Sequence, residues 1–299
     1  MSFIVTLIAA DRLTDEIVRD ATRILVRSNC GPRPFAWIDT GSAGRFVCES
    51  DADTARRVLA PLHDRIDVVV SDGEPEFQAI KLLIADMDST MITVECIDEL
   101  ADYAGIKPQI AAITTRAMRG DLDFGAALSE RVALLAGLDE GVIAQCLAER
   151  VTLMPGARTL VQTMKARGAR CVLVSGGFTR FAEPVAEMIG FDVAIANVLE
   201  VTDGVLTGRV REPIVDSGTK LATLRSQCAA MGIDPSQALA VGDGANDVPM
   251  LVAAGLGIAY HAHPKAVEAA SAAIRHGDLT ALLWAQGIGM ADWVVASPT

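Results

Sequence analysis

The sequence predicts an α/β protein: a parallel sheet with helices on both faces, a helical cap inserted after its first strand, and a small α+β domain before it. The runs LLIAD, CVLVS, ALAVGD and GIAY are almost entirely apolar, as expected for strands buried on both faces. These runs alternate with segments of helical periodicity, which favours a parallel, doubly wound sheet. A helical segment, residues 95–149, separates the first run from the second and is therefore predicted to be an inserted cap.

Residues 3–70 precede that sheet and show the order strand, helix, strand, strand, helix, strand. The predicted elements are Phe3–Ala10, Asp15–Ser28, Phe35–Asp39, Arg45–Cys48, Ala52–Leu62 and Arg65–Val70. Gly41 and Gly44 mark a hairpin between the second and third strands. This order predicts a ferredoxin-like domain and resembles the ACT domains, which often bind amino acids. The alternative interpretation is a structural or dimerising appendage, through which the chain would form a homodimer.

The remaining elements follow in a regular order after the polar stretch Ser71–Phe77, which is predicted to be a linker. The predicted cap helices are Glu95–Gly105, Lys107–Met118, Phe124–Leu135 and Glu140–Glu149. Beyond Pro155, helices Thr159–Arg167, Phe178–Ile189, Lys220–Met231 and Val248–Ala254 alternate with strands at 171–175, 193–197, 238–243 and 257–260. Asp203-Gly204 between apolar flanks predicts a β-hairpin. The expected domains are 1–75 and 76–299, the latter with a core (78–92 and 152–299) and a cap (93–151).

Charge, hydropathy and cysteine content narrow the classes of function. The 299 residues carry a net charge of −12, which argues against broad binding to nucleic acid or anionic membranes. FIVTLIAA is too short for a signal peptide, and no apolar run reaches the roughly 18 residues of a membrane span. The six cysteines form no C-x-x-C pair, so we expect reduced packing residues in a cytoplasmic protein.

Carboxylates follow two of the predicted strands, at the edge where parallel sheets bind ligands. Asp86 and Asp88 end the first run, and residues i and i+2 of an extended chain point the same way. Asp243 and Asp247 follow the ALAVG run. Carboxylates this close cannot all stay ionised without a cation, and ligands that are all oxygen suit a hard ion such as Mg²⁺.

An anion site is predicted beside these carboxylates. Ser175 and the backbone N–H groups of Gly176 and Gly177 follow the second run and precede a helix, which is typical of an anion-binding nest. Lys220 is the candidate counter-cation for a phosphate. An anionic substrate is therefore compatible with the acidic chain, because a local cation overrides the global charge.

Each motif taken alone also has a structural explanation. DxD could be a calcium loop, but the chain lacks Gly at its sixth position and Glu at its twelfth. GDGAND and SGGF could be ordinary turns, and Lys220 a solvated helix residue. His261 and His263 are more simply surface residues than metal ligands. Neither G-x-x-x-x-G-K-[ST] nor G-x-S-x-G occurs, so nucleotide binding and serine hydrolysis lack their usual motifs.

The combination of DMDST, VSGG, a lysine and GDGAND, in that order, resembles the haloacid dehalogenase superfamily of phosphatases over roughly Lys81–Met290. Within it, TVECIDELA, MRGDLDFGAALSERVALL, VSGGFT and AVGDGANDVPML are similar to the phosphoserine phosphatase family. The resemblance implies a Rossmann-like core and Mg²⁺-dependent hydrolysis of phosphoserine, the last step of serine biosynthesis. An alternative is a phosphotransferase or phosphatase of the same superfamily that acts on another small phosphorylated metabolite.

The resemblance also implies a role for each candidate residue. Asp86 would attack phosphorus and form an aspartyl phosphate, and Asp88 would protonate the leaving oxygen and then deprotonate water. Asp86, the Asp88 carbonyl and Asp243 would hold Mg²⁺, with Asp247 supporting the lysine and the metal. The residues implied to bind the phosphoryl group are Ser175, Gly176, Gly177, Lys220 and Asn246.

The cap is implied to select the substrate. Glu95 and Arg131 match the family positions that hold the ammonium and the carboxylate of phosphoserine, with Met118 and Phe124 as an apolar cover. Met118 and Phe124 taken alone are more simply explained as the hydrophobic face of a cap helix. A non-enzymatic phospho-receiver also uses clustered aspartates and a lysine, but receivers have neither an inserted cap nor SGG.

Overall fold

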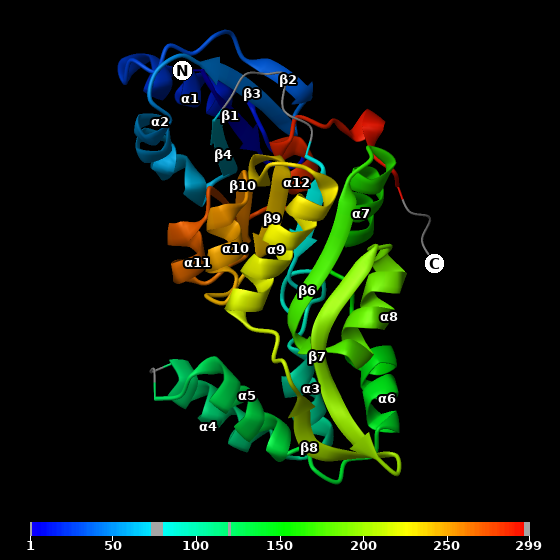
Figure 1. The fold of residues 1–299 in the computed structure, drawn as a ribbon. Coiled ribbons are helices and arrows are strands. Elements are labelled where there is room, and N and C mark those ends of the chain that lie inside the picture. The colour runs from blue at the N-terminus through cyan, green and yellow to red at the C-terminus, as the bar shows by residue number, and fades with distance from the viewer. Residues whose placement is uncertain (1, 73–79, 119–120, 296–299) are drawn as a thin grey trace.

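A computed structural model of the protein describes residues 2–72, 80–118 and 121–295, and its α/β fold contains two sheets (Figure 1). The N-terminal elements are β1 (Phe3–Ile8), α1 (Asp15–Arg27), β2 (Ala36–Asp39), β3 (Ala43–Cys48), α2 (Ala52–Leu59), a 3₁₀ turn (Ala60–Asp64) and β4 (Asp67–Asp72). They form a four-stranded sheet of order β2-β3-β1-β4 with every neighbouring pair antiparallel. The predicted ferredoxin-like arrangement is therefore confirmed.

Both faces of β1, a central strand of this small sheet, are buried. Leu7 packs with α1 and α2, whereas the next residue, Ile8, packs into the hydrophobic core of the main sheet. The linker prediction was wrong at its start, because Ser71 is buried and pairs with Ile4, and Asp72 still belongs to β4. The rest of that predicted linker, 73–77, lies outside the described residues.

The main sheet has the order β11-β10-β9-β5-β6-β7-β8, parallel throughout except for the antiparallel β7–β8 pair. Its strands are β5 (Leu82–Ala85), β6 (Arg170–Phe178), β7 (Val193–Thr202), β8 (Val205–Arg211), β9 (Ala238–Gly242), β10 (Leu256–Tyr260) and β11 (Ala272–Ile274). β5 lies in the centre, so the predicted burial of LLIAD on both faces is confirmed.

Helices cover both faces of this sheet, as predicted (Figure 1). On one face lie α7 (Ala157–Ala166), α8 (Thr179–Ile189) and α12 (Ala281–Ala285); on the other lie α9 (Ser217–Met231), α10 (Val248–Ala253) and α11 (Pro264–Ala269). Successive β5 residues alternate between the two clusters, with Leu83 facing α7 and α8 and Ile84 facing α9 and α10. Within the described residues, no helix combines the length and apolar character that crossing a bilayer requires.

The cap consists of α3 (Cys96–Tyr103), α4 (Lys107–Met118), α5 (Phe124–Ala133) and α6 (Gly141–Arg150), inserted between β5 and β6. Its entry and exit pair through Ile92 and Leu153. The predicted hairpin turn is confirmed, with positive φ at Asp203 (51°) and Gly204 (79°). The β7–β8 hairpin reaches the cap, where the Leu206 N–H donates to the Leu138 carbonyl at 2.9 Å.

The N-terminal sheet is attached at the end of the main domain far from the cap (Figure 1). The buried Asp67 carboxylate accepts the backbone N–H groups of Arg275 (2.6 Å) and Gly277 (2.8 Å), just after β11. Asp39 accepts the Trp284 indole N–H at 2.6 Å. Two acidic side chains of the small sheet thus dock it onto the C-terminal part of the chain.

Candidate active site

The carboxyl ends of β5, β6 and β9 open into a cavity of about 680 Å³ that the cap covers. Asp86 and Asp88 follow β5, Asp243 follows β9, and Ser175 lies near the end of β6. Parallel strands end at the same edge of their sheet, which explains why residues so far apart in sequence meet here. The predicted site residues that line the cavity are Asp86, Asp88, Glu95, Phe124, Arg131, Ser175, Gly176, Gly177, Asp243 and Asn246.

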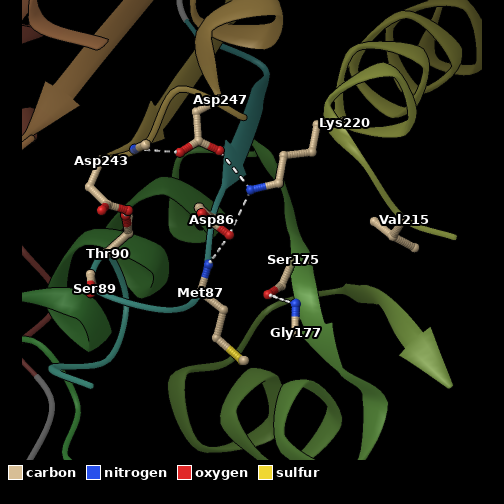
Figure 2. A network of polar contacts seen from close by, with 12 residues as sticks. Asp86, Met87, Ser89, Thr90, Ser175, Gly177, Val215, Lys220, Asp243 and Asp247 are labelled. Carbon is tan, nitrogen blue, oxygen red and sulfur yellow. Dashed lines mark hydrogen bonds and ion pairs between the residues drawn. The ribbon is translucent and has the colours of Figure 1, made fainter. Parts of the chain in front are cut away.

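Lys220 lies beneath the cavity between two carboxylates (Figure 2). Its fully buried Nζ is 2.8 Å from Asp86 Oδ1 and 2.6 Å from Asp247 Oδ1. Asp86 Oδ1 also accepts the Met87 backbone N–H at 2.7 Å, and Asp247 Oδ2 accepts that of Gly244 at 2.9 Å. Burial acts to lower the pKa of Lys220, but Asp86 and Asp247 outweigh it and hold that pKa above its ordinary value.

Asp86 and Asp243 lie in a crowded group of carboxylates, and the pKa of each is raised. Burial, and then repulsion from Asp247, raise the pKa of Asp86 well above its ordinary value, against the opposing effect of Lys220. Burial, followed by the charges of Asp247 and Glu95, raises the pKa of Asp243 to about 6. The charge of Lys220 therefore does not neutralise this group of acids.

Asp88 and Glu95 form the side of the site next to the cap. Asp88 Oδ1 accepts the backbone N–H of Cys96, at the start of α3, at 3.4 Å. Burial, and then the charge of Glu95, raise the pKa of Asp88 to about 7. Glu95 Oε1 accepts the Ser89 hydroxyl at 2.7 Å. The two predicted carboxylates, one from the core and one from the cap, thus line the same cavity, and the charge of Glu95 acts on Asp88.

The glycines after Ser175 leave room for a ligand. Strand β6 continues through them to Phe178, whereas the sequence predicted the strand to end at Ser175. The Gly177 N–H donates to the Ser175 hydroxyl at 2.8 Å. A Cβ atom on Gly177 would lie 3.0 Å from Asp88 Oδ2, and one on Gly176 would lie 3.0 Å from the Phe124 ring. Side chains here would therefore fill the space beside Asp88.

The cap brings Arg131 and Phe124 to the cavity from α5. Arg131 Nε donates to the Ala127 carbonyl at 3.2 Å. Burial lowers the pKa of Arg131, opposed by the carboxylates of Asp98, Glu95 and Asp88. The Met118 side chain lies outside the described part of the chain.

Several residues of the cavity lining, and one buried residue that contacts it, were not predicted. Thr90 is fully buried, and its hydroxyl donates to Asp243 Oδ1 at 3.1 Å. His263 was interpreted as a surface residue; it is exposed, but it lines the cavity together with Lys265. The position of Thr90 beside DMD was an available signal, and so was that of the loop after the predicted strand GIAY, because residues that follow parallel strands meet at the same edge of the sheet. The other cavity residues that were missed are Ile97, Thr114, Ala117, Leu128, Phe178, Ala245 and Pro264.

Asp86, Asp243 and Asp247 are suited to a metal ion. Each offers a carboxylate oxygen, and these atoms lie within 4.8 Å of one another. Oxygen ligands alone and an excess of negative charge favour a hard divalent cation. The predicted ligands were Asp86, Asp88 and Asp243; the cluster adds the Asp247 carboxylate, which was predicted only to support the metal.

Comparisons with known proteins agree with this geometry. The family model described as haloacid dehalogenase-like hydrolase matches residues 83–252. "Phosphoserine phosphatase SerB2" of Mycobacterium tuberculosis is 47% identical over 225 residues, or 75% of this chain, but the chain spans only 55% of that protein. A phosphoserine phosphatase of Polaromonas sp. is 47% identical over 223 residues, covering 72% of this chain and 94% of its own. The unliganded crystal structure of a probable phosphoserine phosphatase from Vibrio cholerae has a TM-score of 0.76 at 33% identity, covering 97% of this chain and 88% of that one.

Proposed function

Because the chain belongs to the haloacid dehalogenase-like hydrolase family, we propose that it is a phosphoserine phosphatase, which converts O-phospho-L-serine and water into L-serine and phosphate. The observation that carries this proposal is the cavity itself. Asp86 and Asp88, which follow β5, line this cavity together with the cap residues Glu95 and Arg131. This set of residues supports a ligand that carries a phosphate as well as the ammonium and carboxylate of an amino acid.

Asp86 is proposed as the nucleophile. Its carboxylate oxygen forms a bond to phosphorus while the bond from phosphorus to the serine oxygen breaks, and Asp88 gives its proton to that oxygen. Asp88 then takes a proton from water, which attacks phosphorus and releases phosphate with both aspartates restored. Asp88 Oδ2 lies beside Gly177, where the absence of a side chain leaves space next to this carboxylate.

The phosphoryl oxygens are proposed to lie against Ser175, Gly176, Gly177, Asn246 and Lys220. Lys220 is held between Asp86 and Asp247. Its positive charge is therefore already in place before a phosphate binds. Asp86, Asp243, Asp247 and the Asp88 carbonyl are proposed to hold Mg²⁺. When bound, Mg²⁺ supplies the positive charge that offsets the charge of the phosphoryl oxygens and of the clustered carboxylates.

The amino-acid part of the substrate is proposed to bind to the cap. Glu95 would accept hydrogen bonds from the ammonium group, and Arg131 would donate to the carboxylate. Phe124 lies close to Gly176 and would shield the reacting centre from water. Met118 is proposed to shield the reacting centre in the same way.

A panel of phosphate esters tests the proposed function. Purified protein with Mg²⁺ is incubated with O-phospho-L-serine, phosphoethanolamine, 4-nitrophenyl phosphate and other small phosphorylated metabolites. We expect phosphoserine to have the highest kcat/KM and inorganic phosphate to appear in step with its loss. A better substrate of another class would contradict the proposal, and substrate loss without phosphate release would indicate transfer to another acceptor.

We expect Arg131 to control specificity rather than chemistry. Hydrogen bonds to charged groups contribute roughly 1.5–3 kcal/mol, so Arg131→Ala should lower kcat/KM for phosphoserine by roughly 10- to 150-fold. Phosphoethanolamine keeps the ammonium but has no carboxylate, so its kcat/KM should change little. Arg131→Lys should recover only part of the loss, because an ammonium cannot make the bidentate contact.

The matched control is Arg150→Ala, because Arg150 is a cap arginine that binds Glu99 and Asp102 and is absent from the cavity lining. It should leave both substrates nearly unchanged. Equal losses on phosphoserine and phosphoethanolamine in Arg131→Ala would show that Arg131 supports the fold or the phosphate site instead.

Mg²⁺ should stabilise the protein, because it relieves repulsion among Asp86, Asp243 and Asp247. At 10–100 times its Kd, a ligand that binds only the folded state adds about 1.4–2.7 kcal/mol to the free energy of unfolding. Thermal unfolding in excess MgCl₂ should therefore give a Tm a few degrees above that in EDTA. Asp243→Asn should reduce this shift, whereas Asp102→Asn, in an exposed ion pair with Arg150, should keep it. If Mg²⁺ raised the Tm of Asp243→Asn as much as that of the wild type, Asp243 would not be a metal ligand.

The N-terminal part is proposed to be a separate ACT-like domain, residues 1–75, beside a phosphatase domain, 76–299, with its core at 78–92 and 152–299 and its cap at 93–151. Every proposed catalytic residue lies in the second domain. We propose that the first domain joins two copies of the chain. The cytoplasm is the proposed location, because the six cysteines are buried and free of disulfides.

A further inference from the structure

Ser89 occupies an uncommon backbone conformation at the active site. Its φ is 54°, in the left-handed region that residues other than glycine seldom adopt. The turn is held by hydrogen bonds from Ser89 N–H to the Val94 carbonyl (3.3 Å) and from Thr90 N–H to the Met87 carbonyl (3.2 Å). Such conformations persist where the surroundings enforce them, and they cluster at functional sites.

This turn directs three consecutive side chains to three partners around one site. Asp88 bonds to the Cys96 N–H, Ser89 to Glu95 and Thr90 to Asp243. In an extended chain, neighbouring side chains would point to opposite faces, and Ser89 would be turned away from its neighbours. Figure 2 shows Ser89 and Thr90 together on the Asp243 side of the site. The left-handed residue is thus what brings the Ser89 hydroxyl to the cap.

The Glu95 side chain needs a partner outside α3 to hold it in one orientation. It stands at the N-cap position of α3, but its side chain makes no capping hydrogen bond. Asp88 instead caps the start of α3, because its Oδ1 accepts the Cys96 N–H. Glu95 is exposed to the cavity, so its flexible side chain would have several orientations available there. The hydrogen bond from the Ser89 hydroxyl, at 2.7 Å, selects one of them.

We propose that Ser89 is a positioning residue whose hydroxyl holds the Glu95 carboxylate in place to receive the ammonium group of the substrate. This inference rests on the proposed function, in which Glu95 binds that ammonium. Ser89 acts through Glu95 and does not touch the reacting atoms. Its effect should therefore appear in the binding of substrates that carry an ammonium and not in the chemistry of phosphate release.

Two variants separate the hydroxyl from the backbone. Ser89→Ala removes the hydroxyl and keeps the strained φ, whereas Ser89→Gly removes the hydroxyl and relieves the strain. Kinetics are measured for phosphoserine and for 4-nitrophenyl phosphate, which has no ammonium. A net hydrogen bond of ordinary strength predicts that both variants lose about three- to tenfold in kcat/KM for phosphoserine, mainly through KM. On 4-nitrophenyl phosphate both should stay within about twofold of wild type.

A double-mutant cycle shows whether Ser89 acts through Glu95. In a Glu95→Ala background, which removes the acceptor of the Ser89 hydroxyl, adding Ser89→Ala should cause no further loss on phosphoserine. Equal losses on the two substrates, or a loss that adds fully to that of Glu95→Ala, would overturn the inference. A wild-type protein that hydrolyses 4-nitrophenyl phosphate but not phosphoserine would instead overturn the proposed function, and the inference with it.

Discussion

Asp86→Asn is expected to keep the fold and to lose more than about 10⁴-fold of the steady-state phosphatase activity, because a carboxamide cannot form the aspartyl phosphate. The fold should survive because the amide oxygen can still accept hydrogen bonds from the Met87 N–H and from Lys220, as Asp86 Oδ1 does. Removing one of three clustered carboxylates also relieves repulsion, so Tm without a divalent cation should not fall.

The measurement is phosphate release by the purified variant, with mass spectrometry to exclude deamidation back to aspartate. Asp102→Asn makes the same chemical change in an exposed ion pair of the cap and should keep nearly full activity. Substantial turnover by intact Asp86→Asn would end the covalent mechanism. Loss of the cooperative thermal transition would mean that the charge of Asp86 is needed for folding.

Asp88→Asn should slow both half-reactions, because one carboxyl group serves first as acid and then as base. General acid–base catalysis contributes about 10²–10⁴-fold, and we expect a loss of that size on phosphoserine. Since 4-nitrophenolate leaves without a proton donor, the first step should suffer less with 4-nitrophenyl phosphate. Rapid mixing should then show a burst of about one 4-nitrophenolate per site, followed by slow hydrolysis of the accumulated aspartyl phosphate.

Asp102→Asn again serves as the matched control and should show wild-type kinetics on both esters. If Asp88→Asn lost less than tenfold on phosphoserine, Asp88 would not be the proton shuttle. A large loss without a burst on 4-nitrophenyl phosphate would show that the aspartyl phosphate forms slowly even where no proton donor is needed, which would contradict the proposed role of Asp88 as the acid of the first step.

Local sequence was sufficient to predict those elements whose conformation depends on residues close together in the chain. The apolar run before Asp86 predicts a buried strand, and Asp203-Gly204 predicts a tight turn that the positive φ values confirm. Elements after Tyr260 were not predicted, because α11, β11 and α12 have six, three and five residues and too few periods to be recognised. The strand β4 was ended too early at Val70, since Ser71 is polar but is buried by its pairing with β1.

The sequence by itself determined the α/β class, the inserted cap and the residues at the carboxyl ends of β5, β6 and β9. It could do so because parallel strands share one direction, so that the residues following them meet at one edge of the sheet. Only the tertiary structure decided how those residues pair. Thr90 reaches Asp243 across 153 positions, Lys220 lies between Asp86 and Asp247, and the Asp67 carboxylate docks the N-terminal sheet onto the turn after β11. Such contacts depend on how helices and strands pack between segments far apart in the chain, where sequence periodicity carries no information. Contacts of 2.6–3.1 Å also require a much more precise placement of both atoms than burial does.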